Sequence, residues 1–332
     1  MVTYVLGAGA SLHAGYPLTT ELGDRLHAWA QQTGFTWGGL IDELNELYGG
    51  LTDLEKILTE LNDRPEGSRA ATLSQTHCGS IIGALNVAIP ELFYNLCQNP
   101  FQGRDLYQEL ARCKLENDDT IITFNYDMAC ERALKVEGKW EIGDGYGFSL
   151  GVAITPPSKT KLLKLHGSTN WLGILFDGHK GSSTATNVYG PRPCLFGERY
   201  FTYLGYSKDV RDPQCRHVSN PGGDPALILP ALQKNFFNQT TFGNEWEPFW
   251  DDIWGQAEQA LQSCEKIVII GYSMPAADER ARELLLRHSN PNAEILVFSG
   301  SKTDDICEEF RKSRFQTVNS FGDRLFEDYL NG

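Results

Sequence analysis

One histidine of this chain stands where a side chain could accept a proton. His166 lies near the end of KLLKLHG, residues 161–167. The apolar residues there predict a short buried strand that ends at a loop. A histidine at a strand end titrates near neutral pH and can act as a general base. The alternative is a structural histidine whose hydrogen bonds are satisfied inside the protein.

A carboxamide and a carboxylate follow a second apolar stretch. Asn125 and Asp127 come directly after TIITF, residues 120–124. An amide side chain donates and accepts hydrogen bonds at once, so Asn125 can hold a sugar hydroxyl or a water molecule. Asp127 can order the loop or bind a ribose. The alternative is that Asn125 caps the helix predicted to follow it.

A glycine-rich turn opens the chain. GAGAS, residues 7–11, follows the apolar residues 2–6 and precedes a helical period. Such a turn lets backbone N–H groups approach a pyrophosphate. The usual dinucleotide fingerprint is not met, because Leu12 stands where a third glycine is needed and the next glycine is Gly15. The alternative is a structural turn without a ligand.

A fourth polar segment, GYSMPAADE, follows the apolar stretch KIVII. Its backbone amides and the Ser273 hydroxyl suit a phosphate or a ribose. The alternative is a plain turn between a strand and a helix. In that case Pro275 stands in the first helical turn, and Asp278 and Glu279 stabilise the helix dipole.

The elements that carry these segments alternate between apolar strands and helical periods. This alternation favours a Rossmann-like α/β fold, in which helices cover both faces of a parallel sheet. Ligands bind such sheets at the carboxyl ends of the strands. The segments GAGAS, NYD, HGSTN and GYS should therefore line one edge of the sheet. Strands are predicted at residues 2–6, 120–124, 161–167, 226–229, 266–274 and 294–300 and near 315–318.

We expect a single domain over residues 1–332. Residues 38–115 have a helical period and predict a helical insertion or cap within it. Residues 172–225 are rich in Gly, Pro, Ser and Asn and predict an irregular loop region. Further helices are predicted at residues 20–31, 276–288 and 321–330. Another is predicted over a segment with a tryptophan every four residues, and this spacing predicts that the tryptophans pack in the core or against another subunit. These tryptophans are Trp246, Trp250 and Trp254.

Composition excludes several classes of protein. The formal net charge of −14 and the pI near 5.0 argue against a long basic groove for nucleic acid. The longest apolar runs have the length of strands, so no membrane span is expected. The N-terminus lacks the pattern of a signal peptide, and we expect a soluble, cytoplasmic protein. The eight cysteines form no C-x-x-C pair, which argues against a zinc ribbon.

Taken in order, these segments resemble the sirtuin family. They are most similar to its bacterial branch of NAD-consuming anti-phage defence proteins. The motifs that carry the resemblance are GAGAS (7–11), TFNYD (123–127), LHGSTNW (165–171) and GYSMP (271–275), and more loosely PALILP (225–230). In this order, the set of motifs spans nearly the whole chain.

The resemblance implies that NAD is bound as a substrate and that no metal is required. It implies catalytic roles for His166 as the base, Asn125 beside the nicotinamide ribose, and Asp127. It also implies a set of cofactor-binding residues at the strand ends. That set is Gly7, Ala8, Gly9, Ala10, Ser11, Thr123 and Gly271, together with Ser273 and Ser299 on the adenosine side.

Two departures separate the chain from sirtuins that deacetylate lysine. The region 172–225 contains only Cys194 and Cys215 and cannot form the four-cysteine zinc module of those enzymes. The segment GYPLTTE replaces the familiar GIPDFR, so its arginine is missing. Both departures favour NAD hydrolysis, in which the nicotinamide–ribose bond is cleaved to release nicotinamide and ADP-ribose and NAD is depleted in infected cells.

Alternatives to hydrolysis remain open. One is a non-catalytic nucleotide sensor or scaffold subunit, and another is an NAD-dependent deacylase or ADP-ribosyltransferase. Unrestrained hydrolysis would harm the host, so we expect control by homo-oligomer assembly or by a separate partner. The resemblance suggests an ATPase, an Argonaute-type protein or a nucleotide-sensing subunit as that partner.

Overall fold

The computed structural model describes two compact units of the chain. The first unit comprises Met1–Tyr16, Pro100–Gly167 and Glu247–Gly332, and the second comprises Pro17–Asn99 and Ser168–Trp246. The single domain with an insertion at 38–115 stays a prediction. The described residues are 1–98, 103–141, 144–148, 157–173, 192–193, 224–227, 247–276 and 278–332.

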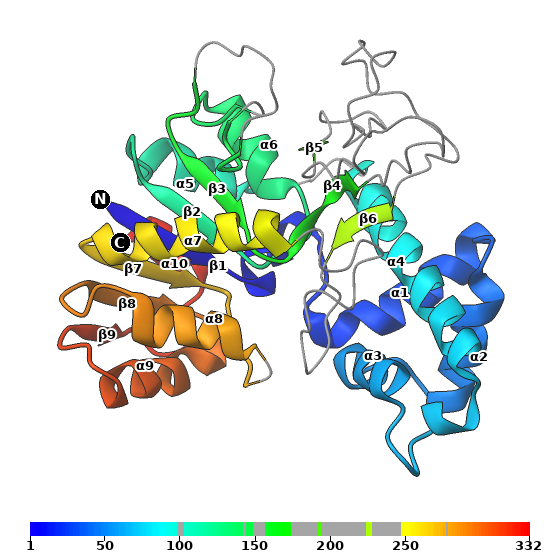
Figure 1. Ribbon diagram of the computed structural model, residues 1–332. Coiled ribbons are helices and arrows are strands. Elements are labelled where there is room, and N and C mark those ends of the chain that lie inside the picture. The colour runs from blue at the N-terminus through cyan, green and yellow to red at the C-terminus, as the bar shows by residue number, and fades with distance from the viewer. Residues whose placement is uncertain are drawn as a thin grey trace, which may run out of the picture. The chain divides into compact units, whose positions relative to one another are not determined.

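A six-stranded parallel sheet forms the centre of the first unit (Figure 1). Its strands pair in the order β3-β2-β1-β7-β8-β9, and each pair is parallel. Most of its residues are buried, as expected for strands that are apolar throughout. The sheet confirms the predicted Rossmann-like α/β fold. Its strands are β1 (Val2–Leu6), β2 (Thr120–Thr123), β3 (Lys161–Lys164), β7 (Lys266–Ile270), β8 (Glu294–Phe298) and β9 (Val318–Ser320).

The strand order locates the edge at which a ligand would bind. When the six strands of this sheet are numbered along the chain, their spatial order is 3-2-1-4-5-6. This is the strand order of the doubly wound dinucleotide-binding fold. The direction of winding reverses between β1 and β7, which are direct neighbours. In such folds the binding crevice lies at the carboxyl ends of the strands beside this reversal. GAGAS and GYS follow these two strands.

Helices cover both faces of this sheet (Figure 1). Because connections between parallel strands are right-handed, α7, α8 and α9 lie on one face and α5 and α6 on the other, where α10 packs against α5. Trp250 and Trp254 of α7 are buried in the core, which confirms a core role for these two tryptophans, and Trp246 lies outside the described residues. The helices are α5 (Leu106–Cys113), α6 (Ala129–Val136), α7 (Glu247–Ser263), α8 (Glu279–Glu283) with a π-helical turn (Leu284–His288), α9 (Thr303–Lys312) and α10 (Phe326–Asn331).

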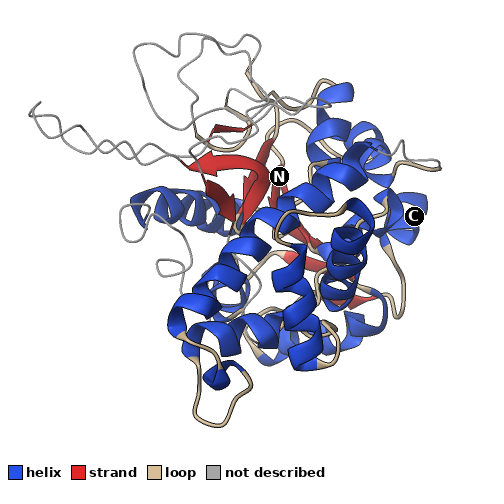
Figure 2. Ribbon diagram, turned by 90° about the vertical axis from the view of Figure 1, so that its right-hand side faces the viewer, coloured by secondary structure: helices blue, strands red, loops and turns tan. Residues whose placement is uncertain are grey.

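The described part of the second unit is mostly helical (Figure 2). The helix predicted at 20–31 is confirmed as α1, and Leu22, Leu26 and Ala30 form its buried face. Short strands pair in the order β5-β4-β6. The elements are α1 (Thr19–Thr33), α2 (Gly38–Tyr48), α3 (Leu54–Asp63), the 3-10 helix η2 (Ala70–Thr72), α4 (Gln75–Gln98), β4 (Gly167–Gly173), β5 (Arg192–Pro193) and β6 (Asp224–Leu227).

Several predicted boundaries differ from the structure. The helix predicted at 276–288 begins at Glu279, because Met274 takes a left-handed conformation (φ 47°) and the chain turns once more before the helix. The strand predicted near 315–318 spans Val318–Ser320 instead. Within the region 172–225, three short parts belong to β4, β5 and β6, and the rest, with Cys194 and Cys215, lies outside the described residues.

One helix of the second unit is apolar enough to reconsider the expectation about membranes. Residues Gln75–Cys97 of α4 have the length and mean hydropathy of a membrane span, although half of the apolar stretch of 18 residues within this helix is buried inside the protein. The buried core helix of a soluble protein has the same properties, so this helix is weak evidence for a span.

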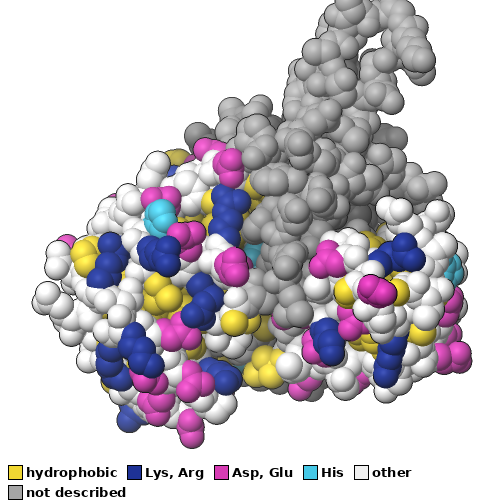
Figure 3. All heavy atoms as spheres, turned by 60° about the horizontal axis from the view of Figure 1, so that its bottom comes forward, with side chains coloured by type: hydrophobic (Ala, Val, Ile, Leu, Met, Phe, Trp, Pro, Cys, Tyr) yellow, Lys and Arg dark blue, Asp and Glu magenta, His cyan; other side chains and the backbone are white. Residues whose placement is uncertain are grey.

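On the face shown in Figure 3, Lys and Arg side chains lie interspersed with Asp and Glu.

Candidate functional site

The glycine turn and the turn after β7 pack against each other, backbone to backbone. The N–H of Gly7 donates to the carbonyl of Ile270 at 3.0 Å, and the N–H of Gly9 donates to that of Gly271 at 2.9 Å. A Cβ on Gly7 would lie 2.5 Å from the Cα of Tyr272, and one on Gly9 would lie 2.9 Å from the Cα of Gly271. The close approach of the neighbouring backbone therefore requires glycine at these two positions, whether or not a ligand binds there.

The hydroxyl of Ser11 is the centre of a buried hydrogen-bond network. It donates to Asp127 Oδ2 at 2.7 Å, accepts from Asn125 Nδ2 at 3.0 Å and lies 2.7 Å from the hydroxyl of Tyr107. Because a serine hydroxyl has one hydrogen, Tyr107 is the donor in the last pair. Burial, followed by the nearby Asp127 carboxylate, raises the pKa of Tyr107 well above its usual value and keeps this donor protonated.

This network changes the role expected for Ser11. Its side chain is 1% exposed, and its one donor and two acceptor positions are all used within the protein. Ser11 therefore acts on the site by joining the glycine turn to the loop after β2. A cofactor-binding role for Ser11 stays a prediction.

Asn125 holds the glycine turn rather than a helix end. Its Nδ2 donates to the carbonyl of Gly7 at 2.8 Å as well as to Ser11. Both amide hydrogens are thereby used, and Oδ1 is the atom that can accept from a substrate hydroxyl or water. The cap predicted as the alternative for Asn125 is wrong, because Asp127 Oδ1 accepts the N–H of Ala129 at the start of α6, at 2.9 Å.

A buried ion pair supports the loop that carries Asn125 and Asp127. Lys164 Nζ lies 2.7 Å from Glu131 Oε1, with both side chains fully buried, and also donates to the carbonyl of Asp127. The hydroxyl of Tyr146 donates to the same Glu131 oxygen at 3.0 Å. Burial raises the pKa of Glu131, and the charge of Lys164 opposes that rise.

His166 forms a pair with an acidic residue from across the sheet edge. Its Nε2 lies 3.2 Å from Asp278 Oδ2, and the two side chains are 4% and 1% exposed. Asp278 precedes α8, yet its side chain makes no capping hydrogen bond there. Pro275 does not stand in the first helical turn, as the alternative of a plain turn predicted, because α8 begins at Glu279. The Asp278 carboxylate faces His166 rather than the helix end.

Phe124 joins the two groups of site residues. Its ring stacks on that of Tyr272, with centroids 4.4 Å apart, and lies 5.0 Å from the imidazole of His166. Phe124 directly precedes Asn125, so the loop after β2 contacts both the histidine and the glycine turn. The structure thus gathers the ends of β1, β2, β3 and β7 at one sheet edge, as the alternation of strands and helices predicts.

The remaining predicted site residues lie around this centre. Thr123 is buried, donates to the carbonyl of Leu6 at 3.2 Å and accepts the N–H of Asn125 at 3.1 Å. Ser299 donates to the carbonyl of Tyr272 at 3.1 Å. In the glycine turn, Ala10 is fully buried and Ala8 is half-buried. Ser273 is exposed, and the binding role of each of these residues stays a prediction.

Three functional candidates of this site were missed by the sequence analysis. Tyr107 comes from α5, inside the region predicted as an insertion, and nothing in its local pattern indicated a site. Lys164 stood in the quoted stretch before His166 but reads as an exposed strand lysine. Asp278 was noted, with a role at the helix dipole. Only the sheet order brings these three side chains to the predicted residues.

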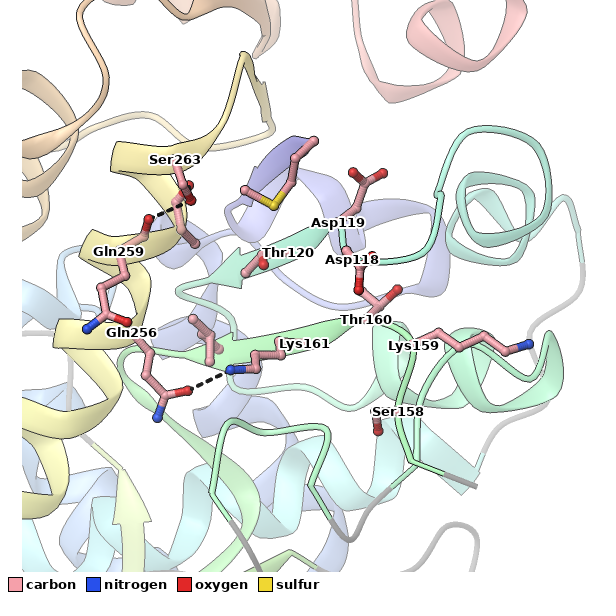
Figure 4. A pocket seen from close by; sticks show the side chains of 13 residues that line it. Asp118, Asp119, Thr120, Ser158, Lys159, Thr160, Lys161, Gln256, Gln259 and Ser263 are labelled. Atoms are coloured by element: carbon pink, nitrogen blue, oxygen red, sulfur yellow. Dashed lines mark hydrogen bonds between the residues drawn. The ribbon is translucent and has the colours of Figure 1, made fainter. Parts of the chain in front are cut away.

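A separate pocket lies at the opposite edge of the sheet (Figure 4). Its volume is about 280 Å³, and its lining includes Thr120 and Lys161 at the starts of β2 and β3 and Gln256 of α7. No predicted site residue lines it. The described residues hold no cluster of His, Cys, Asp and Glu that could bind a metal.

Comparisons with known proteins find similarity only among solved structures. No protein-family model and no curated protein sequence matches the chain. A structure from work on the mechanism and regulation of Sir2 enzymes has 14% identity and a TM-score of 0.41, with 99% of this chain and 89% of that chain covered. A Sir2 homologue in complex with NAD has 15% identity and a TM-score of 0.38, with 94% and 88% covered. A mutant Sir2 homologue with ADP-ribose has 13% identity and a TM-score of 0.40, with 93% and 90% covered.

Proposed function

We propose that the chain is an NAD⁺ hydrolase of the sirtuin-like kind. It would convert NAD⁺ and water into nicotinamide, ADP-ribose and a proton. The observation that supports this proposal is the convergence of His166, Asn125 and the glycine turn at the carboxyl edge of the sheet, beside the reversal between β1 and β7. That edge is where doubly wound sheets bind dinucleotides.

The chemistry of the bond explains the choice of residues. Cleavage of the nicotinamide–ribose bond sends the bonding electrons to nicotinamide and develops positive charge on the sugar, as in glycoside hydrolysis. Water then adds to the anomeric carbon and loses a proton. His166 is the group that would take this proton, or one from a ribose hydroxyl, and such a base contributes on the order of 10²–10⁴-fold to the rate.

Asn125 would contribute through its carbonyl oxygen. Both of its N–H bonds are used on Gly7 and Ser11, so Oδ1 would accept a hydrogen bond from the attacking water or from a ribose hydroxyl. The glycine turn and the turn at Gly271 would bind the pyrophosphate and the adjacent ribose. Asp127 would keep this loop in position by its bonds to Ser11 and Ala129.

One experiment separates hydrolysis from binding alone. Purified full-length protein is incubated with NAD⁺, with and without candidate activators, and nicotinamide and ADP-ribose are quantified by chromatography. We expect both products from the wild type and none from His166→Ala. His288→Ala is the matched control, because His288 pairs with Glu258 at a half-exposed position of the same unit, and it should retain full activity. Equal activity in both variants would reject the assigned site.

A substitution of Asn125 tests its two functions separately. Asn125→Asp keeps an oxygen at the accepting position but loses both N–H donors to Gly7 and Ser11. We expect lower stability together with lower turnover. A variant that is as stable as the wild type would show that the amide donors do not hold the glycine turn.

The second candidate function is a non-catalytic nucleotide sensor or scaffold. The observation that favours it is the deep burial of His166 and the use of both Asn125 donors within the protein. Calorimetry with NAD⁺ would then detect binding, while no nicotinamide forms under any activating condition. Transfer of ADP-ribose or deacylation of an acetyl-peptide would instead support the deacylase or transferase alternative.

A hydrolase of this kind requires an off-switch in its host. We propose control by homo-oligomer assembly or by a partner protein, in a cytoplasmic anti-phage role that depletes NAD⁺. Light scattering of the purified chain, alone and with products of neighbouring genes, tests this part. A monomer with full activity would contradict it.

A further inference from the structure

We propose that Asp278 is a positioning residue for His166. It accepts a hydrogen bond from the Nε2–H of His166 and so sets both the tautomer and the orientation of the imidazole. His166 follows β3 and Asp278 directly precedes α8, and the two side chains are joined by the 3.2 Å contact between Nε2 and Oδ2. The part of this inference that concerns catalysis rests on the proposed hydrolase function.

The tautomer follows from the chemistry of the pair. A carboxylate accepts hydrogen bonds and donates none, so the ring nitrogen that faces Asp278 carries the proton. In a neutral imidazole the other nitrogen, Nδ1, is then the basic one. If a proton moves from water to Nδ1 during hydrolysis, the imidazolium that forms is stabilised by the adjacent carboxylate, as in other histidine–aspartate pairs.

The orientation follows from a closed circuit of contacts. Tyr272 donates its hydroxyl to the same Asp278 oxygen at 3.4 Å, and its ring stacks on Phe124. Phe124 in turn packs against the imidazole of His166, and the ring of Trp254 is tilted toward the same imidazole, with ring centroids 6.5 Å apart. Rotation of the imidazole would break the contact with Asp278 and disturb these aromatic neighbours.

The backbone directs Asp278 away from the helix that follows it. Met274 has a positive φ of 47°, which is unusual for a residue with a side chain, and its carbonyl accepts from Arg282 Nη1 at 3.0 Å. The N–H of Asp278 donates to the carbonyl of Pro275 at 3.0 Å. This turn leaves the carboxylate without a capping bond to α8 and buries it against His166.

The first test reads the tautomer directly in the full-length protein. Histidine is labelled with ¹⁵N, the His166 signals are assigned by their loss in His166→Gln, and long-range ¹H–¹⁵N spectra are recorded near neutral pH. We expect a protonated Nε2 and an unprotonated Nδ1 in the wild type. A wild type with the proton on Nδ1 would overturn the proposal, whatever the variants do.

The second test compares two neighbouring carboxyl groups. Asp278→Asn places an amide that can donate where the acceptor stood, so we expect the tautomer signature to change and kcat to fall by about 10²–10⁴-fold with KM little altered. Glu279→Gln is the matched control, since Glu279 is exposed and lies in the first turn of α8. It should change neither the spectrum nor kcat.

The outcomes distinguish this inference from the proposed function. If the wild type does not hydrolyse NAD⁺, the proposed function fails, while the spectra of wild type and Asp278→Asn still decide the role of Asp278. If both variants lower kcat equally and leave the tautomer unchanged, charge at the start of α8 is responsible and the inference is wrong.

Discussion

Replacing Gly271 by alanine should separate the turn after β7 from the glycine turn. Gly271 has a φ of 60°, and an added Cβ would overlap the amide nitrogen of Ala10 and approach the Cα of Gly9 to 2.7 Å. These are backbone atoms, so no side chain can rotate away. The left-handed conformation itself costs an alanine about 1–2 kcal/mol, and the overpacking costs about 1–3 kcal/mol more.

A matched variant isolates the overlap. Gly138 has nearly the same φ of 64°, lies in the same unit and would place its Cβ in open space. Gly138→Ala should therefore lower the free energy of unfolding by only the conformational cost of about 1–2 kcal/mol. Gly271→Ala should lower it by about 2–5 kcal/mol, the sum of the two costs.

Urea denaturation followed by tryptophan fluorescence measures the two free energies. Hydrogen exchange of the peptide that contains Gly9 adds a local readout, because its N–H donates to the Gly271 carbonyl. We expect this peptide to exchange faster in Gly271→Ala and at the wild-type rate in Gly138→Ala. Equal destabilisation by the two substitutions, with unchanged exchange at Gly9, would refute the packing argument.

Three further predictions concern the surroundings of the site. Ser11→Ala leaves the buried hydrogen-bond partners of Ser11 unsatisfied and should lower the free energy of unfolding by about 1–3 kcal/mol. In the same urea assay, Ser80→Ala is the control, because Ser80 is exposed, and it should change that free energy by less than about 0.5 kcal/mol. Lys164→Met leaves the carboxylate of Glu131 buried without its cation and should lower the free energy of unfolding by about 3–5 kcal/mol. The double variant Lys164→Met with Glu131→Leu should recover most of this loss. A double variant that recovers none of it would contradict a stabilising role for the ion pair. Burial raises the pKa of Asp105, but the imidazole of His13, whose Nε2 lies 3.6 Å from Oδ1, and the hydrogen bond from the N–H of Gln108 outweigh it, and the pKa is lowered. A folded-state pKa below the unfolded value contributes stability above about pH 4, which is lost as the pH falls through the folded value. The advantage of the wild type over Asp105→Ala, about 1 kcal/mol at pH 7, should therefore shrink below pH 4, and an advantage that grows there would show that the sign is wrong.

The strands and their polar ends could be predicted because their signals are local. Five apolar residues followed by glycine or by Asn-Tyr-Asp indicate a buried strand and its end without knowledge of the rest of the chain. The parallel sheet follows from the alternation of such strands with helices, and the meeting of GAGAS, NYD, His166 and GYS at one edge follows from the sheet. Boundaries next to an unusual backbone were predicted less well. The start of α8 moved to Glu279, because the left-handed Met274 leaves no local sign.

The sequence by itself determined the type of fold, the four strand ends and the residues His166, Asn125 and Asp127 that they carry. The tertiary structure decided what each of these side chains contacts. It turned Asn125 and Ser11 inward to join two loops, and it placed Asp278 against His166 although 111 positions separate them in the sequence numbering. The physical reason is that hydrogen bonds across a parallel sheet edge join residues distant in the chain, and their partners depend on strand order, which no local pattern encodes.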